Sequence, residues 1–260
     1  MLFDGGISMN QRNKKNKKDK KENVKILGPE DLMHLDVESV VDIVNQKIKG
    51  NKKEVKKIKP EGFEHYYTEN PTSEMRSKKL KLKLKNDHEY IFKSVTGVYG
   101  KKKIDKATRL LIENAEIYGE NILDIGCGYG PIGITLKKEN PNLKMYMSDI
   151  NNRACDYAGV NAKDNNADIE IRQGYLYEPW EDMMFDTIIS NPPIVAGKKV
   201  WQSLIEGSYK HLNKDGVLLL VAYHNKGGKR IQEYMENIFK NVDTLQKSGG
   251  IRVYKSIKEE

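Results

Sequence analysis

From about residue 105 onward, the chain alternates between two kinds of segment, and this alternation limits the folds open to it. Short runs of branched apolar residues, typical of buried strands, take turns with longer stretches of helical spacing. The expected strands lie near 121–125, 143–149, 168–172, 185–190 and 216–223, and the expected helices near 105–117, 131–139, 152–164, 198–211 and 227–239. Such alternation favours a mostly parallel sheet with helices on both faces. The sequence therefore predicts a doubly wound α/β domain.

Antiparallel strand pairs are expected on either side of this pattern. The stretch "LKLKLK" (80–85) alternates strictly, and "EYIFK" (89–93) follows it after an Asn-Asp pair. This pattern predicts a β-hairpin with lysines on its open face. The last segment, "NVDTLQKSGGIRVYKS" (241–256), predicts two antiparallel strands joined at a Gly-Gly turn.

The positive charge of the chain is concentrated before the main domain. The formal net charge is +8. Residues 1–60 hold 15 Lys/Arg and 9 Asp/Glu, residues 61–103 hold 10 and 6, and residues 104–260 hold 20 and 22. A basic arm beside a nearly neutral domain favours a phosphate-rich partner such as RNA. A solvated tail that only aids solubility is the alternative.

Two regions are predicted: an extension over residues 1–60 and the main domain over residues 61–260. Within the extension, the Lys/Asn-rich residues 10–23 are expected to be disordered. Residues 29–49 have one apolar stripe and are expected to form a helix.

Composition argues against several classes of protein and site. No stretch approaches the ~20 apolar residues of a membrane helix, so no membrane partner is expected. Two cysteines cannot build a disulfide framework, and the N-terminus lacks a secretory apolar core, so a cytoplasmic location is expected. The five histidines have no metal-ligand spacing, so no metal is expected. The oligomeric state stays open.

A glycine-rich stretch, "ILDIGCGYGPIG" (122–133), joins the first expected parallel strand to a helix. Gly126, Gly128 and Gly130 let the backbone turn sharply and approach a ligand closely. Asp149 follows Gly130 by 19 residues, at the end of the next expected strand, where a carboxylate can take the ribose hydroxyls of an adenosine. The stretch also satisfies G-x-G-x-x-G, so a nicotinamide-dependent dehydrogenase is an alternative.

Two further features favour a methionine-containing cofactor over a dinucleotide. Asp124 stands two residues before Gly126, where an acid can meet the amino group of a methionine moiety but would repel a pyrophosphate. The stretch "FDTIISNPPI" (185–194) ends the fourth expected strand on an amide and two prolines, where open α/β sheets bind substrates. A capped strand end with a tight turn is the alternative explanation of that stretch.

These motifs resemble those of the class I S-adenosylmethionine (SAM)-dependent methyltransferases. "LDIGCGYG" is similar to their first motif, "MSDIN" (147–151) to their second, and "NPPI" (191–194) to the fourth motif of amine-methylating members. Longer stretches, including "TGVYGKKKIDKATRLLIEN" and "GGIRVYKS", resemble the RsmC-like guanine methyltransferases of small-subunit ribosomal RNA and their compact single-domain relatives, over roughly residues 64–257. The resemblance implies a Rossmann-like, seven-stranded sheet and SAM as the cofactor.

The resemblance also implies roles for individual residues. The Asn191 side-chain oxygen and the Pro192 carbonyl would accept hydrogen bonds from an exocyclic base amine and aim its lone pair at the methyl group of SAM. The implied catalytic residues are Asn191, Pro192, Pro193 and Ile194, and the implied cofactor-binding residues are Asp124, Gly126, Gly128, Gly130, Asp149, Ile150, Tyr175, Leu176, Asn191, Asp105 and Thr108. Helix capping is an alternative role for Asp105 and Thr108.

The chain departs from the family pattern at three positions. Tyr175 stands where the family often has an acid for adenine, so backbone groups of Tyr175 and Leu176 are expected to bind adenine instead. Val195 replaces an arginine after the NPPI turn, which leaves the target open. Ile194 replaces a tyrosine or phenylalanine and offers an aliphatic face to the base.

The predicted function is methyl transfer from SAM to an exocyclic base amine in RNA, with guanine in small-subunit ribosomal RNA favoured. The predicted partner is ribosomal RNA or a ribosomal particle. Methyltransferases that act on tRNA, DNA adenine or protein glutamine are alternatives, and so is a non-catalytic RNA-binding member of the fold.

Overall fold

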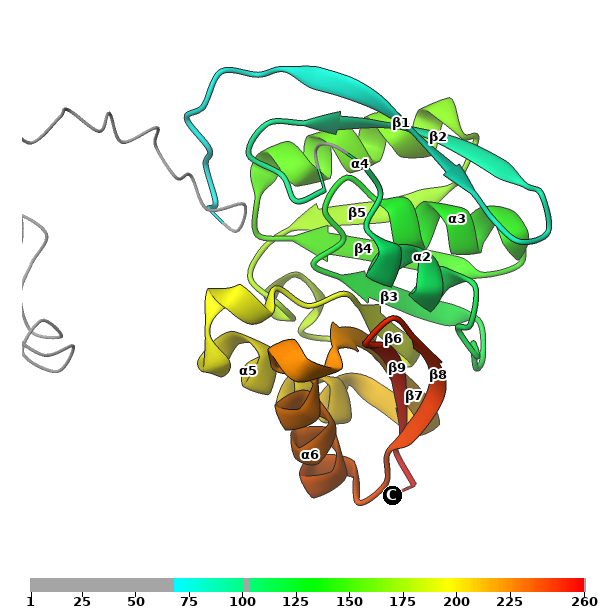
Figure 1. Ribbon diagram of the computed structural model, residues 1–260, viewed down its shortest axis with the longest axis vertical. Helices are drawn as coiled ribbons and strands as arrows, with labels where there is room; N and C mark the ends of the chain where they lie inside the picture. Colours follow the sequence, from blue (N-terminus) through cyan, green and yellow to red (C-terminus); the bar gives the residue numbers. More distant parts are fainter. Residues whose placement is uncertain (1–67, 101–102, 260) are drawn as a thin grey trace, which may run out of the picture. The chain divides into compact units, whose positions relative to one another are not determined.

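The computed structural model describes residues 68–100 and 103–259. These residues form a two-stranded hairpin and a seven-stranded sheet with helices on both faces (Figure 1). The predicted doubly wound fold and its preceding hairpin are thus confirmed. The expected extension over residues 1–60, with its helix at 29–49, lies outside the described residues.

The seven-stranded sheet has the order β5-β4-β3-β6-β7-β9-β8. Strands β3 to β7 run parallel to one another, whereas β9 runs antiparallel to both β7 and β8. The strands are β1 (Ser77–Lys83), β2 (Glu89–Val95), β3 (Asn121–Ile125), β4 (Lys144–Asp149), β5 (Ile169–Gln173), β6 (Phe185–Ser190), β7 (Leu212–Tyr223), β8 (Asp243–Ser248) and β9 (Ile251–Ile257). The helices are α2 (Lys106–Ile112), α3 (Pro131–Glu139), α4 (Asn152–Asp164), α5 (Lys198–His211) and α6 (Gly228–Phe239), with short 3₁₀ turns η2 (Glu178–Trp180), η3 (Ile194–Ala196) and η4 (His224–Lys226).

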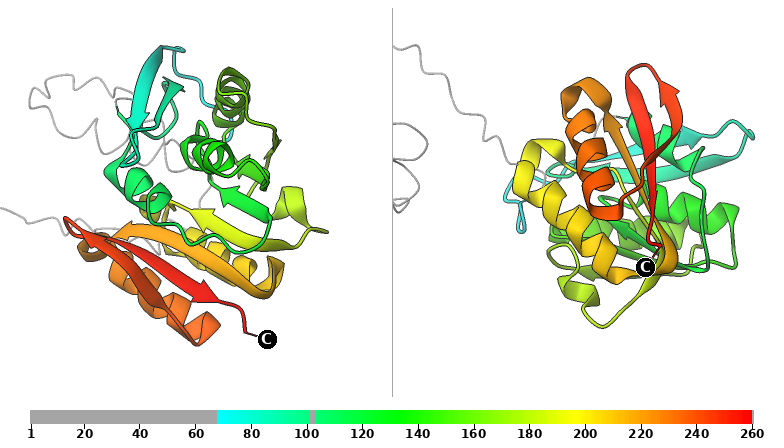
Figure 2. Two further views of the ribbon diagram at one scale, coloured as in Figure 1. Left: turned by 90° about the vertical axis from the view of Figure 1, so that its right-hand side faces the viewer. Right: turned by 90° about the horizontal axis from the view of Figure 1, so that it is seen from below.

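Apolar side chains on both faces of the sheet build two cores. Helices α2, α3 and α4 cover one face, and α5 and α6 cover the other (Figures 1 and 2). Successive residues of a strand point to opposite faces, so Ile189 packs in the first core and Ile188 in the second. The central strands are buried on both faces, which explains their continuous apolar runs. Within the described residues, none of the helices has the length and apolar character needed to cross a bilayer.

The β1–β2 hairpin packs its apolar face on helix α4 and leaves its lysines outside. Leu80, Leu82 and Phe92 are buried, as strict alternation predicts. The buried Asn161 of α4 joins the two elements, because its Oδ1 accepts from the Lys93 N–H at 2.7 Å and its Nδ2 donates to the Lys93 carbonyl at 2.9 Å. A fully paired amide of this kind holds the hairpin at one register.

Helix α2 is shorter than the sequence pattern predicted. The expected helix over 105–117 ends at Ile112 instead. Asn114 donates from its side chain to the Leu110 carbonyl at 2.7 Å, and its backbone N–H donates to the Leu111 carbonyl. Asparagine side chains compete with the helical backbone in this way, and the apolar residues beyond belong to the connection leading into β3.

The strand order changes direction at β3, and the functional loops start there. β4 and β5 lie on one side of β3, while β6 and β7 lie on the other. The Ser190 hydroxyl donates to the Ile125 carbonyl at 2.7 Å and ties together the carboxyl ends of β6 and β3. Ligands of open α/β sheets bind at such a switch point.

Candidate active site

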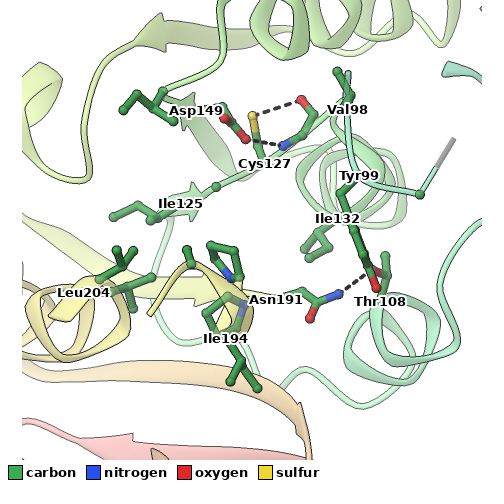
Figure 3. Close-up of a pocket in the computed structure, with 18 of the residues that line it drawn as sticks. Val98, Tyr99, Thr108, Ile125, Cys127, Ile132, Asp149, Asn191, Ile194 and Leu204 are labelled. Atoms are coloured by element: carbon green, nitrogen blue, oxygen red, sulfur yellow. Dashed lines mark hydrogen bonds between the residues drawn. The ribbon is translucent and has the colours of Figure 1, made fainter. Parts of the chain in front are cut away.

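A pocket with a volume of about 490 Å³ opens at the carboxyl ends of β3, β4 and β6 (Figure 3). Its wall combines the glycine loop after β3, the NPPI turn after β6 and the start of α2. The predicted site residues that line it are Asp105, Thr108, Gly126, Gly128, Asp149, Ile150, Tyr175, Leu176, Asn191, Pro192, Pro193 and Ile194. Asp124 and Gly130 lie outside the lining. The fold therefore gathers most of the predicted residues, which come from five separate stretches, around one cavity.

The glycine loop adopts backbone conformations that side chains rarely permit. Gly126, Gly128 and Gly130 have φ values of +70°, +57° and +88°. Nothing lies within 4 Å of where a Cβ of Gly126 would stand, so a ligand can approach the backbone there. Gly130 has a different role, because its Cβ would stand 2.6 Å from Ile134 in α3. Gly130 therefore allows close packing beneath the loop and does not itself face the pocket.

Asp149 stands at the end of β4 and fixes the glycine loop. Its Oδ2 accepts from the Gly128 N–H at 2.9 Å, and its Oδ1 accepts from the Asn151 N–H at 2.9 Å. Burial raises the pKa of Asp149, and these backbone hydrogen bonds oppose the rise. Each carboxylate oxygen has a further lone pair, so both can still accept from a ligand hydroxyl.

Asp124 is buried beneath the loop and lies outside the pocket lining, and its contact with the amino group of a methionine moiety stays a prediction. Its Oδ2 accepts from the Gly133 N–H of α3 at 3.0 Å. Its Oδ1 is buried and has no hydrogen-bond partner among the described residues. Burial raises the pKa of Asp124 to about 7, and the charge of Asp149 adds to the rise. A buried carboxylate with a vacant acceptor is suited to a cationic amino group, which would supply the missing partner.

The two prolines of the NPPI turn give it a fixed shape. Pro193 has φ −75° and ψ 80°, and the Ile194 N–H donates to the Pro192 carbonyl at 2.9 Å. These values are typical of an inverse γ-turn, whose φ the proline ring already favours. The Pro192 carbonyl has a second lone pair that this turn leaves open to a substrate.

The Asn191 amide is oriented by helix α2. Its Nδ2 donates to the Thr108 hydroxyl at 3.0 Å and to Asp105 Oδ2 at 3.3 Å (Figure 3 shows the Thr108 bond). A carboxylate can only accept, so the amide nitrogen must face Asp105 and the amide oxygen must face elsewhere. That oxygen accepts no hydrogen bond from the described residues. The arrangement leaves an acceptor of known direction beside the Pro192 carbonyl.

Tyr175 and Leu176 both line the pocket, and their backbone contact with adenine stays a prediction. The Tyr175 N–H donates to Glu178 Oε2 at 3.2 Å, and its carbonyl accepts from the Glu178 N–H at 3.1 Å. The Tyr175 carbonyl keeps a second lone pair that can accept from a ligand. Leu176, with φ +48°, also lines the pocket and is a second backbone candidate for adenine.

Several pocket residues were not predicted from the sequence. Tyr223, the last residue of β7, and Lys226, the last residue of η4, line the pocket, and the Lys226 ammonium lies 5.6 Å from the centre of the Tyr223 ring. Gly227, with φ +104°, lets this loop close on the NPPI turn, since its Cβ would stand 2.7 Å from Ile194. The contact between these distant loops has no local signal in the sequence. Among the described residues, no group of three or more His, Cys, Asp or Glu could hold a metal ion.

Comparisons with known proteins agree with this architecture. The family model of the methyltransferase small domain matches residues 89–255. The uncharacterized protein YbxB of Bacillus subtilis is 36% identical over 200 residues, covering 75% of this chain and 98% of YbxB. Ribosomal RNA small subunit methyltransferase C is 29% identical in Aeromonas hydrophila and 32% identical in Haemophilus influenzae, covering 65% and 62% of this chain. The matched region spans about half the length of these two enzymes, 50% and 49%.

Solved structures show the same fold at lower identity. The 16S rRNA N2 methyltransferase RsmC of T. thermophilus, solved with AdoMet and guanosine, has a TM-score of 0.61 at 20% identity, covering 72% of this chain and 52% of that one. A methyltransferase of Pyrococcus furiosus has a TM-score of 0.52 at 22% identity, covering 57% of this chain and 80% of that one.

The pocket suits SAM, the cofactor of this family. The open backbone at Gly126 gives a cradle, Asp149 offers acceptor oxygens at a strand end, and the buried Asp124 lacks a donor. The match to the methyltransferase small domain over residues 89–255 rules out the dehydrogenase alternative. The chain belongs to the methyltransferase small domain family, and it is a class I SAM-dependent methyltransferase of the RsmC-like type.

Proposed function

We propose that this enzyme methylates the exocyclic N2 amine of guanine in RNA, with small-subunit ribosomal RNA as the substrate. The observation that carries the proposal is the Asn191 amide, whose oxygen is left as an acceptor beside the Pro192 carbonyl. The rRNA methyltransferases at 29% and 32% identity, and the neighbouring structure that holds guanosine, support RNA guanine as the substrate class.

An aromatic amine needs orientation more than it needs a base. Its lone pair is delocalised into the ring, so it attacks poorly unless the nitrogen is held and aimed. SAM, when bound, supplies a methyl group on a positively charged leaving group. In the proposed mechanism, Asn191 Oδ1 and the Pro192 carbonyl accept from the two amine hydrogens and direct the lone pair along the line of attack.

The proposed reaction balances without a strong general base. Asn191 and Pro192 would hold the amine nitrogen while it forms the new N–C bond, and the methyl group would come from a sulfonium, which would leave as a neutral thioether. The methylated nitrogen would then carry a positive charge and would lose one proton to solvent. Ile194 lies against the same turn and offers an apolar surface to the face of the base, which keeps water from the amine.

The test uses SAM labelled on its methyl group with unmodified ribosomal RNA, ribosomal particles and total protein. Label in N2-methylguanosine, lost in Asn191→Ala, would support the proposal. Asn152→Ala is the matched control, because Asn152 donates to Asn70 at the surface and lies outside the pocket lining. It should keep wild-type activity. Circular dichroism and SAM binding should show that both variants fold.

Two outcomes would overturn the proposed substrate. Label recovered in glutamine side chains would indicate a protein methyltransferase. Label in N6-methyladenine, from RNA or from DNA added in a parallel reaction, would indicate an adenine enzyme. Either result would keep the methyltransferase assignment and replace guanine.

A further inference from the structure

Asp105 sits at the N-cap of α2, yet its side chain does not cap that helix. Its backbone is extended, with φ −65° and ψ 142°, and the side chain makes no capping hydrogen bond. Aspartate at an N-cap normally accepts from a backbone N–H of the first turn. Here Asp105 Oδ2 accepts from Asn191 Nδ2, across 86 residues of sequence. The carboxylate therefore hydrogen-bonds to a residue of the pocket and does not cap its own helix.

Among the described residues, one oxygen of the Asp105 side chain has no hydrogen-bond donor. Its Oδ1 accepts no hydrogen bond from the described residues, and it forms no ion pair with any of them. Tyr129 and Tyr223 line the same pocket as Asp105. Burial raises the pKa of both tyrosines, and the charge of Asp105 adds to the rise. A carboxylate so placed at a pocket wall accepts readily from a ligand.

Asp105 and Asn191 together present two acceptors side by side. The carboxylate turns the Asn191 nitrogen toward itself, so the amide contributes only its oxygen to the pocket. A ligand that fits this pair must carry two neighbouring donors on one edge.

Guanine has such an edge, and the competing amines do not. Its N1–H and its N2 amine are adjacent donors. In adenine and cytosine, the amine stands beside a ring nitrogen that accepts, and in glutamine it stands beside a carbonyl oxygen. Those acceptors would repel the Asp105 carboxylate, because neither group carries a hydrogen to donate. A site that is built to accept from a ligand donor rejects ligands without that donor strongly.

We propose that Asp105 is the base-reading residue, which accepts from guanine N1–H while Asn191 Oδ1 accepts from the N2 amine. This inference rests on the proposed function and assigns the choice of base to a residue outside the NPPI motif. It separates Asp105 from the cofactor-binding role that family resemblance implies for it.

The test compares guanine with 2-aminopurine, which keeps the N2 amine but has an acceptor at N1. A short synthetic RNA carries the guanosine that the labelling experiment identifies, and its twin carries 2-aminopurine there. Both RNAs compete in one reaction, and mass spectrometry measures the ratio of initial rates. If the short RNAs are not methylated, the same replacement is made in ribosomal RNA by ligation. Wild type should prefer guanine by about 10- to 100-fold, the range for a hydrogen bond to a charged group.

Two variants separate base reading from structure. Asp105→Asn can donate to or accept from position 1, so its preference should fall to within about threefold. Thr108→Val removes the other partner of Asn191 but keeps the carboxylate, so it should slow both RNAs equally and keep the preference. SAM affinity, measured by calorimetry, should stay within about threefold of wild type in Asp105→Asn.

Each contrary result has its own meaning. An unchanged guanine preference in Asp105→Asn would overturn the inference. So would a loss of SAM affinity without a change in preference, because Asp105 would then hold the cofactor. A wild type that methylates guanine and 2-aminopurine equally would also overturn it. Failure of the proposed function looks different, because no methylated guanosine would be found in any RNA.

Discussion

Asp124 allows a quantitative test through the free energy of unfolding, because its carboxyl group is buried with only one of its two oxygens hydrogen-bonded. Its side chain is 0% exposed, and only Oδ2 is hydrogen-bonded, to the Gly133 N–H. Burial raises the pKa of Asp124 from 3.8 to about 7. The change Asp124→Asn keeps an acceptor for Gly133 and removes the titration. The variant thus resembles wild type with Asp124 protonated.

The raised pKa sets the sign and size of the expected effect. The unfolded aspartate ionises near 3.8 and the folded one near 7, so ionisation costs stability as the pH rises between these values. The cost is constant above the folded pKa. At about 1.4 kcal/mol per pKa unit, it reaches roughly 4 kcal/mol at pH 8 and less than half of that at pH 5. Asp124→Asn should therefore be more stable than wild type at pH 8, by an amount that shrinks toward pH 5.

Urea unfolding without cofactor at pH 5, 6, 7 and 8 measures this difference. Asp168→Asn is the matched control, because Asp168 is exposed on the surface. Its stability should follow wild type at every pH. The reasoning would be refuted by a difference between Asp124→Asn and wild type that does not change with pH, or by a variant less stable than wild type at pH 8.

The same titration predicts how SAM binding depends on pH. A cationic amino group near Asp124 requires the ionised acid, so binding at pH 6 should release a proton and should be weaker than at pH 8. Calorimetry in buffers of different ionisation enthalpy measures the released proton. Asp124→Asn should lose that part of the release and bind SAM more weakly at pH 8. Equal proton release by wild type and variant would contradict a contact between Asp124 and the cofactor.

Three further predictions concern other parts of the chain. Gly227→Ala should lower the free energy of unfolding by about 1–2 kcal/mol or more and slow methyl transfer, because φ is +104° and the Cβ would stand 2.7 Å from Ile194; unchanged denaturant unfolding would contradict this. Burial raises the pKa of Glu139, but hydrogen bonds from Tyr90, His88 and Asn86 outweigh it and lower the pKa below its ordinary value. The β1–β2 hairpin should therefore lose stability as the pH falls through that lowered pKa. Hydrogen exchange of β1 and β2 should show this loss in wild type and a smaller pH response in Glu139→Gln. Deleting residues 1–60 should weaken RNA affinity at low salt and have less effect at high salt, and unchanged affinity at low salt would contradict a phosphate-binding role.

The elements of this fold were predictable because each one carries a local pattern. Alternation in "LKLKLK" identified β1, and the closely spaced apolar residues Phe185, Ile188 and Ile189 identified β6. A glycine loop followed by a helix, and an acid at the next strand end, located the edge of the sheet where the pocket lies. The end of α2 escaped prediction, because Asn114 ends the helix through a side-chain contact while apolar residues continue beyond it.

The contacts within the site were less predictable, because they join residues that are far apart in sequence. Asp124 belongs to a motif that suggested a place in the pocket, but its Oδ2 accepts a hydrogen bond from the Gly133 N–H of α3 beneath the glycine loop. Tyr223 and Lys226 come from a loop with no motif, and only the strand order β6-β7 brings them beside the NPPI turn. Sequence spacing reports neighbours along one element, whereas these contacts depend on how elements pack.

The backbone of the NPPI turn is set by its own prolines, whereas the orientation of its asparagine amide is set by residues far away in the sequence. The prolines set the backbone and place the Pro192 carbonyl, so the proposed methylation of an amine depends on the motif itself. The direction of the Asn191 amide comes from Thr108 and Asp105, which lie 83 and 86 residues earlier. If Asp105 reads the base, then chains with the same motif but another residue at that N-cap would present a different edge to the substrate. The choice of base should then follow the residue at position 105, even where the motif and the cofactor loop are unchanged.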